Sequence, residues 1–127
     1  MGTLAELTEL KWKRQMKLNE LSDLNDDYKL YAQALIDMGT VIQHFDSFVD
    51  DVKKRVNGYN EGDYVWQGYH YYKMKKFRAN CGSYMLVVEH IKDVIVNKKS
   101  QCYNAIQDKQ GEINTLTTQI DNFVVEG

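Results

Sequence analysis

Apolar residues in the first half of the chain recur at alternating intervals of three and four residues. Between residues 21 and 56 no polar residue interrupts the series, which comprises Leu21, Leu24, Tyr28, Tyr31, Leu35, Met38, Ile42, Phe45, Val49, Val52 and Val56. This spacing places the side chains on one stripe of a helix, here called the seam, along which helices pack in a coiled coil or bundle. Thr3 is a suitable capping residue, and Glu6 stands where it can complete a capping box. A helix is therefore predicted over about residues 3–57.

The second half of the chain repeats this spacing. Its first series comprises Met74, Phe77, Cys81, Tyr84, Val88, Ile91 and Ile95. After the polar Lys98 the series resumes at Cys102 in a changed register. A similar change precedes Leu21, where Lys11 and Arg14 occupy seam positions, and such shifts locally overwind or underwind a coiled coil. A second helix is predicted over about residues 68–123, and residues 124–127 are expected to fray.

A tip of about residues 58–67 separates the two helical segments. It contains Gly58 and Gly62, and an aromatic stretch follows from Tyr64 to Tyr72. A glycine-rich break between two helical patterns is typical of a helical hairpin, and the absence of proline from all 127 residues favours uninterrupted helices. The prediction is one all-α domain over residues 1–127: a long, coiled-coil-like antiparallel two-helix hairpin with a Trp-x-Gly turn at its tip.

The apolar stripe is wider than a two-helix seam requires. Ala34, Val41 and Phe48 extend it on one flank, which indicates contact with more than one helix. Because two helices cannot cover so wide a stripe, a partner or self-association is expected. The residues predicted to form the partner-binding seam are Tyr31, Leu35, Met38, Ile42, Phe45, Phe48, Val49, Tyr84, Val88, Ile91 and Ile95.

Charge is unevenly distributed although the formal net charge is only −2. Residues 1–65 carry 8 basic and 12 acidic side chains, whereas residues 66–127 carry 8 and 6. With a turn near residue 62, facing residues have numbers that sum to about 125, so Asp46, Asp50 and Asp51 would face the basic segment 73–78. Solvated faces that differ by chance explain the asymmetry equally well. The small net charge argues against general nucleic-acid binding.

No residue cluster in the sequence indicates a reaction. His44, His70 and His90 are isolated from one another, and the two cysteines form no C-x-x-C pair. In a continuous helix Cys81 and Cys102 would lie roughly 30 Å apart, too far for a disulfide, so both are expected to be free, buried thiols. We predict no catalytic residue, no metal, no cofactor and no enzyme activity.

Gly39 and Gly82 lie inside the two predicted helices and nearly opposite one another. Each costs a helix about 1 kcal/mol relative to alanine. They are explained either by the close approach of a neighbouring helix or as tolerated weak points, and the sequence does not separate these alternatives.

Trp66 and Gly68 form a Trp-x-Gly step where the second helix is expected to begin, and Phe77 follows nine residues after Gly68. Together with the proline-free arms, this turn motif resembles the WXG superfamily of small helical proteins of type VII (ESX-like) secretion. The similarity is greatest to YwqH-like, LXG-toxin-associated helical proteins. The resemblance implies a non-catalytic targeting chaperone that binds the helical amino-terminal domain of an LXG-type toxin. Beside a second small helical protein, it would help to present the toxin to the secretion system.

One element often found in that superfamily is missing from the sequence. No Tyr-x-x-x-Asp/Glu export signal follows Trp66, because Tyr84 is spaced to Val88 and Tyr103 to Gln107. A partner would therefore supply the signal. Without a Sec-type leader or an apolar run long enough for a membrane span, we expect a cytoplasmic protein with no membrane contact, co-secreted only with its partner.

Two alternatives come from other functional classes. One is a self-associating structural coiled coil, such as a homodimer that forms a four-helix bundle. The other is an immunity protein that neutralises a toxin.

Overall fold

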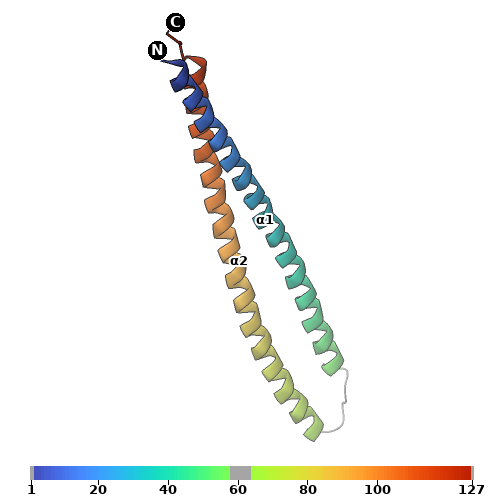
Figure 1. Cartoon of the computed structure of the whole chain (residues 1–127). Coiled ribbons are helices and arrows are strands. Elements are labelled where there is room, and N and C mark those ends of the chain that lie inside the picture. The colour runs from blue at the N-terminus through green and yellow to red at the C-terminus, as the bar shows by residue number, and fades with distance from the viewer. Residues whose placement is uncertain (1, 58–63, 127) are drawn as a thin grey trace. The chain divides into compact units, whose positions relative to one another are not determined.

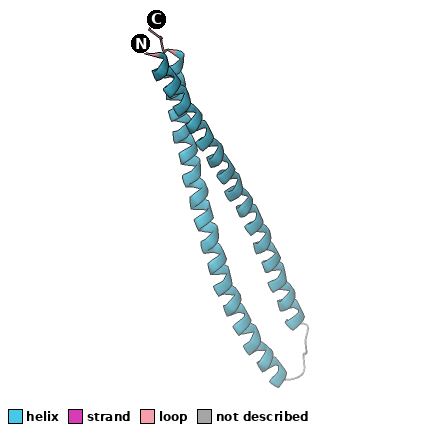
Figure 2. Ribbon diagram, viewed as in Figure 1, coloured by secondary structure: helices cyan, strands magenta, loops and turns pink. Residues whose placement is uncertain are grey.

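A computed structural model describes the backbone of residues 2–57 and 64–126, and the side chains of residues 2–54 and 72–126. Two long helices pack against each other and run in opposite directions: α1 (Leu4–Asn57) and α2 (Tyr64–Asp121) (Figures 1 and 2). The predicted all-α helical hairpin is confirmed. The second helix begins at Tyr64, four residues before the expected boundary. Trp66 and Gly68 therefore lie within its first helical turns, and the prediction that they form the turn between the helices is wrong. The rest of the predicted tip, residues 58–63, lies outside the described residues.

The beginning of α1 is capped as the sequence predicts. The Glu6 amide donates a hydrogen bond of 3.2 Å to Thr3 Oγ1, and the Leu7 amide donates one of 3.1 Å to the Thr3 carbonyl. An N-cap hydroxyl of this kind satisfies an amide that has no partner within the helix.

The two chain ends are joined by backbone hydrogen bonds. The Gly2 amide donates to the Val124 carbonyl at 3.1 Å, and the Glu126 amide donates to the Gly2 carbonyl at 3.0 Å, forming a parallel bridge between Gly2 and Val125. The expectation that residues 124–127 fray is therefore wrong for Val124 to Glu126. The sequence carried no signal for this pairing, because the bond partners are 122 and 124 positions apart in a chain of 127 residues.

Contacts divide the chain into two compact units. Unit 1 comprises Met1–Gln33 with Val96–Gly127, and unit 2 comprises Ala34–Ile95. Each unit contains a segment of α1 and a segment of α2. The single-domain organisation stays a prediction.

The seam of α1 follows one register along its whole described length. The half-buried residues at alternating three- and four-residue spacing are Leu7, Leu10, Arg14, Lys17, Leu21, Leu24, Tyr28, Tyr31, Leu35, Met38, Ile42, Phe45, Val49 and Val52. The predicted change of register before Leu21 is therefore wrong. Arg14 and Lys17 occupy seam positions because their long aliphatic stems can lie against the neighbouring helix while the charged heads reach water. Leu18, three residues before Leu21, is exposed and does not belong to the seam.

The seam of α2 departs from its predicted course after Cys81, although Val88 and Ile95 keep their predicted places in it. Met85 and Lys99 are half-buried in place of Tyr84 and Lys98, and a single register then runs through Cys102 to Phe123. The predicted change of register at Cys102 is thus wrong. Three apolar side chains among the described residues are buried: Val88, Cys102 and Ile106.

Ring contacts and one thiol fix the register of the helices within each unit. In unit 2, Phe45 lies 4.8 Å from Tyr84 and Phe48 lies 6.3 Å from Phe77, measured between ring centroids. In unit 1, Tyr28 lies 6.4 Å from Tyr103, and Cys102 Sγ donates a hydrogen bond of 3.2 Å to the Leu24 carbonyl. The numbers of these facing residues sum to between 125 and 131, close to the predicted 125.

In the described part of the chain, the predicted charge pairing in unit 2 is absent for three of the basic residues, Lys75, Lys76 and Arg78. Among the described residues, Asp46, Asp50 and Asp51 make no ion pair with Lys75, Lys76 or Arg78. The ion pairs that join α1 and α2 in unit 1 lie at residues the sequence did not single out.

Neither interior glycine marks a contact between the two helices. A Cβ atom placed on Gly39 or Gly82 would meet no atom within 4 Å. Within the described chain, the close-approach explanation is therefore wrong.

Candidate functional site

A charged layer interrupts the apolar seam of unit 1. Lys17 of α1 lies 3.1 Å from Glu112 of α2, and Lys109 of α2 forms a hydrogen-bonded ion pair with Glu20 of α1. Lys109 also lies 3.4 Å from Glu112. The four side chains form an alternating network of two cations and two anions. Because polar groups at seam positions restrict which neighbours can face them, this layer fixes helix register.

The network shifts the protonation equilibria of its members. The hydrogen bond and charge of Lys109 lower the pKa of Glu20, and the hydrogen bond from Lys17 lowers the pKa of Glu112. The hydrogen bond to Glu20 raises the pKa of Lys109. All three shifts favour the charged forms of Glu20, Glu112 and Lys109.

An open apolar groove adjoins this charged layer. Its lining residues are Trp12, Lys13, Met16, Lys17, Glu20, Glu112, Thr115, Leu116 and Gln119. Trp12 is 61% exposed and Met16 is 41% exposed, so two large apolar side chains stand open to solvent in one hollow. Both residue types are enriched at protein interfaces. The sequence prediction missed this groove because Trp12 and Met16 lie off the seam; their spacing of four residues was the available signal.

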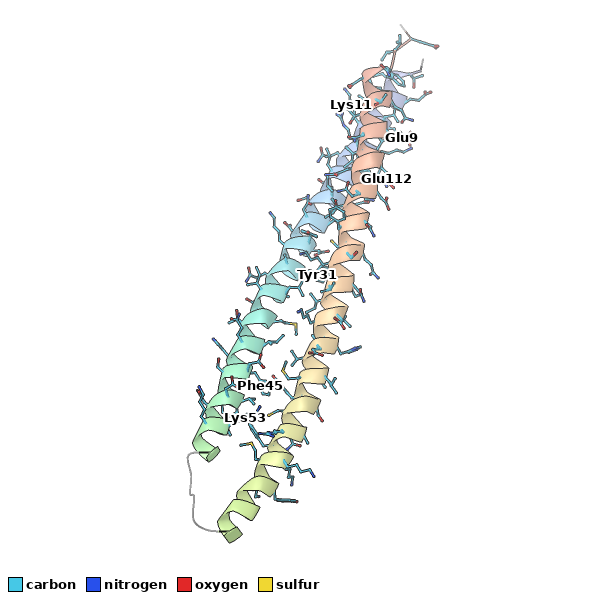
Figure 3. All side chains as sticks on the ribbon, turned by 180° about the vertical axis from the view of Figure 1, so that it is seen from behind. Glu9, Lys11, Tyr31, Phe45, Lys53 and Glu112 are labelled. Atoms are coloured by element: carbon cyan, nitrogen blue, oxygen red, sulfur yellow. The ribbon has the colours of Figure 1, made fainter. Side chains whose placement is uncertain are left out.

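The predicted partner-binding residues separate into two groups. Eight are buried or half-buried where the two helices meet: Tyr31, Leu35, Met38, Ile42, Phe45, Val49, Val88 and Ile95. Tyr31 and Phe45 lie on the side of α1 that is turned toward α2 (Figure 3). The other three, Phe48, Tyr84 and Ile91, are exposed. The second group is open to solvent, although Phe48 and Tyr84 also contact rings of the other helix. Which of the two groups binds a partner stays a prediction.

Exposed apolar residues in unit 2 form a surface here called the unit 2 face. It comprises Val41, Phe48, Tyr84, Val87, Ile91 and Val94, each between 43% and 58% exposed. Val41 and Phe48 directly precede the α1 seam residues Ile42 and Val49. On α2, Tyr84 directly precedes the seam residue Met85, and Ile91 follows one heptad later.

Helix geometry places these two flanks on the same side of the hairpin. In an antiparallel pair, the positions that directly precede the seam on one helix lie beside the equivalent positions of the other. The ring contacts agree, because the exposed Tyr84 packs on Phe45 and the exposed Phe48 packs on Phe77. The unit 2 face is therefore one surface with contributions from both helices.

The turn motif is only partly described. Phe77 is half-buried, and its ring packs edge-on against Phe48. Trp66 and Gly68 lie in helix α2, but the position of the Trp66 side chain lies outside what the structure describes. The predicted sealing role of Trp66 stays a prediction.

The described residues contain no arrangement for metal binding and no disulfide. No group of three or more His, Cys, Asp or Glu side chains among them could hold a metal ion. Cys81 is half-buried and Cys102 buried, and both are free thiols. Burial, and secondarily the charge of Asp27, raise the pKa of the Cys102 thiol. In the same residues, no helix is long and apolar enough to cross a membrane.

Fold and surface together define an all-α helical hairpin with exposed apolar surface on both of its units. A comparison with protein-family models, curated proteins and solved structures finds no match to this chain.

Proposed function

We propose that this chain is a non-catalytic binding protein that works by burying apolar helix surface against a partner. The proposal rests on one observation: few apolar side chains are buried, and many large ones are exposed. Among the described apolar side chains only Val88, Cys102 and Ile106 are buried, while the groove and the unit 2 face leave large apolar residues exposed. Grooves between helices accept the apolar face of another amphipathic helix, which is a common mode of protein recognition.

The specific partner in this proposal is the helical amino-terminal domain of an LXG-type toxin. The support is the sequence resemblance, namely Trp66, Gly68 and Phe77 between two long proline-free helices. The chain would bind the toxin beside a second small helical protein and help to present it to a type VII secretion system. Because no Tyr-x-x-x-Asp/Glu signal follows Trp66, the toxin or the second protein would carry the export signal. The chain would stay in the cytoplasm or leave it with its partner.

The apolar groove of unit 1 is the first candidate for this contact. A solvent-exposed tryptophan beside a methionine offers a large apolar anchor at the edge of a charged layer, and tryptophan is among the commonest interface hot spots. Because the ion pairs around the groove are already satisfied within the chain, its recognition would rest on apolar contact. We therefore expect a partner helix to present an apolar side chain to Trp12 and Met16.

Co-expression with the open reading frames that neighbour the gene, followed by affinity capture, tests the proposal. The expected result is a stable complex with a helical toxin domain. The double variant Trp12→Ala/Met16→Ala should weaken that complex about tenfold or more. Leu30→Ala is the matched control, because Leu30 is 69% exposed and does not line the groove. A purified toxin domain that fails to bind the intact chain would contradict the proposal.

The same material separates the alternatives from other classes. An immunity protein would inhibit the toxin's own activity in the purified complex, whereas a targeting partner would leave that activity unchanged. A structural coiled coil would self-associate and bind no toxin domain.

A further inference from the structure

The end of α2 lacks the features that commonly hold the last turn of a helix. No basic side chain lies in its final turn, and its last residue, Asp121, adds a negative charge where the helix dipole is already negative. No glycine cap follows, because the next residues are Asn122 and Phe123. A helix end of this kind frays unless another part of the chain ties it down.

The contact that ties it down is here called the terminal clasp and consists of Gly2, Phe123, Val124 and Glu126. Gly2 donates a backbone hydrogen bond of 3.1 Å to Val124 and accepts one of 3.0 Å from Glu126. The half-buried Phe123 ring occupies the space that a side chain at position 2 would need. A Cβ atom on Gly2 would lie 2.7 Å from Phe123 Cζ and would also overlap the Glu6 carboxylate. The clasp closes in this form only with glycine at position 2.

The α2 wall of the unit 1 groove lies in the turns that the clasp anchors. Beyond Glu112, this wall consists of Thr115, Leu116 and Gln119, all within the last two turns of α2. At the other end of the wall, Glu112 is joined to Lys17 of α1 by an ion pair of 3.1 Å. The groove therefore lies between two links of α1 to α2, and opening the clasp would leave the α2 wall anchored at one end only.

We propose that the terminal clasp orders the α2 wall and thereby prepares the unit 1 groove for its partner, with Gly2 as the positioning residue. The second half of this inference rests on the proposed function, because it takes the groove as the contact with the partner. A partner that meets an ordered wall loses no binding free energy to ordering it, which is the general effect of pre-organisation. By linkage, a partner bound in the groove also stabilises the closed clasp.

Amide hydrogen exchange of the isolated full chain, followed by NMR, tests the ordering of the wall without any partner. Gly2→Val should open the clasp, because even its Cβ atom would overlap Phe123. We expect the three wall amides beyond Glu112 to exchange about tenfold faster in this variant. Val124→Ala is the matched control and should leave their exchange unchanged. The Val124 side chain is 56% exposed, and the clasp uses only the carbonyl of this residue for its hydrogen bond.

Glu126→Pro opens the clasp by a different route and guards against misfolding of Gly2→Val. Proline removes the amide that donates to the Gly2 carbonyl. Val125 is bridged to Gly2, and the extended backbone of such a bridge is the form that a residue before proline favours. Glu126→Pro should therefore give the same faster exchange of the wall. Circular dichroism should show that both variants keep the helix content of the unaltered chain.

Affinity for the helical toxin domain is measured with the same variants. Gly2→Val and Glu126→Pro should raise the dissociation constant by about tenfold, and Val124→Ala should leave it unchanged. None of these three residues lines the groove, so the loss of affinity reports the order of the wall rather than a missing contact. Binding of the toxin domain should in turn slow the exchange of the Glu126 amide.

The outcomes separate this inference from the proposed function. Wall amides that exchange in both clasp variants as they do in the unaltered chain would overturn the inference. Faster exchange of the wall with an unchanged dissociation constant would overturn the role of the clasp in binding. If the toxin domain fails to bind the unaltered chain while the wall still loses its protection in the variants, the proposed function is contradicted and the ordering of the groove by the clasp is retained.

Discussion

Lys17 of α1 and Glu112 of α2 lie 3.1 Å apart across the seam of unit 1, at a level where an uninterrupted apolar stripe would place two hydrophobic side chains. Next to this pair, Lys109 of α2 forms an ion pair with Glu20 of α1, so that here α2 supplies the cation and α1 the anion. An apolar stripe tolerates small slips of one helix along the other, whereas a charged layer of this kind is satisfied in one register.

The charged layer predicts a loss of stability at acidic pH. The pKa values of Glu20 and Glu112 are held below their ordinary value of 4.5, so the unfolded chain binds protons before the folded chain does. The stabilising contribution is therefore present above pH 4.5 and is lost as the pH falls through the folded-state pKa values. The melting temperature, measured against pH, should decline in that range.

Glutamine substitutions provide the control for the acid transition. Glu20→Gln/Glu112→Gln should flatten the acid limb of the stability profile, because neither side chain can then titrate. Glu9→Gln should leave the acid limb in place, since Glu9 pairs with Lys13 on the exposed surface of one helix, 3.5 Å away. If Glu20→Gln/Glu112→Gln and Glu9→Gln give the same profile of melting temperature against pH, the charged layer is not the cause of the loss of stability in acid.

Cys102 and Cys81 should differ in thiol reactivity. The Cys102 thiol is buried and donates a hydrogen bond to the Leu24 carbonyl, and burial raises its pKa, so little reactive thiolate is present near neutral pH. Cys81 is only half-buried. In the native protein, a thiol reagent should modify the Cys81→Ser variant more slowly than the Cys102→Ser variant. If the two variants react with the thiol reagent at the same rate in the native protein, and also at the same rate after denaturation, the burial of Cys102 is contradicted.

Alanine at Gly39 or Gly82 should stabilise the isolated chain. Both lie in helices, and a Cβ atom at either would meet nothing within 4 Å, so each substitution should add about 1 kcal/mol to the free energy of unfolding. Gly111→Ala, in α2 of unit 1, is in equally open space and should behave alike. If the Gly39 or Gly82 variants are more stable alone but bind a partner more weakly, those glycines serve the close approach of the partner helix.

Truncation at a buried and an exposed isoleucine should give very different results. Ile106 is 7% exposed, so Ile106→Ala should lower the free energy of unfolding by about 2 kcal/mol or more. Ile36 is 62% exposed, and Ile36→Ala should change it by less than about 0.5 kcal/mol. Denaturant unfolding of both variants measures this difference. Similar losses would mean that Ile36 is covered in solution, for instance by another chain.

Local sequence patterns are enough to predict the elements of this fold. The three- and four-residue spacing from Leu21 to Val52 predicted which side of α1 is half-buried, and Thr3 predicted its cap. The lack of proline and the glycine-rich centre predicted two helices and their approximate ends. These features are local, because helix periodicity and capping depend on residues only a few positions apart.

The contacts between the two helices could be read only from the tertiary structure. It placed Lys17 in the seam, replaced Tyr84 by Met85 in the α2 seam, and joined Gly2 to Val124 and Glu126. The physical reason is that polar side chains with long stems can occupy seam positions once an opposite charge or open water lies within reach. That condition depends on residues nearly a hundred positions away, as for Lys17 and Glu112, and no pattern within one helix contains it.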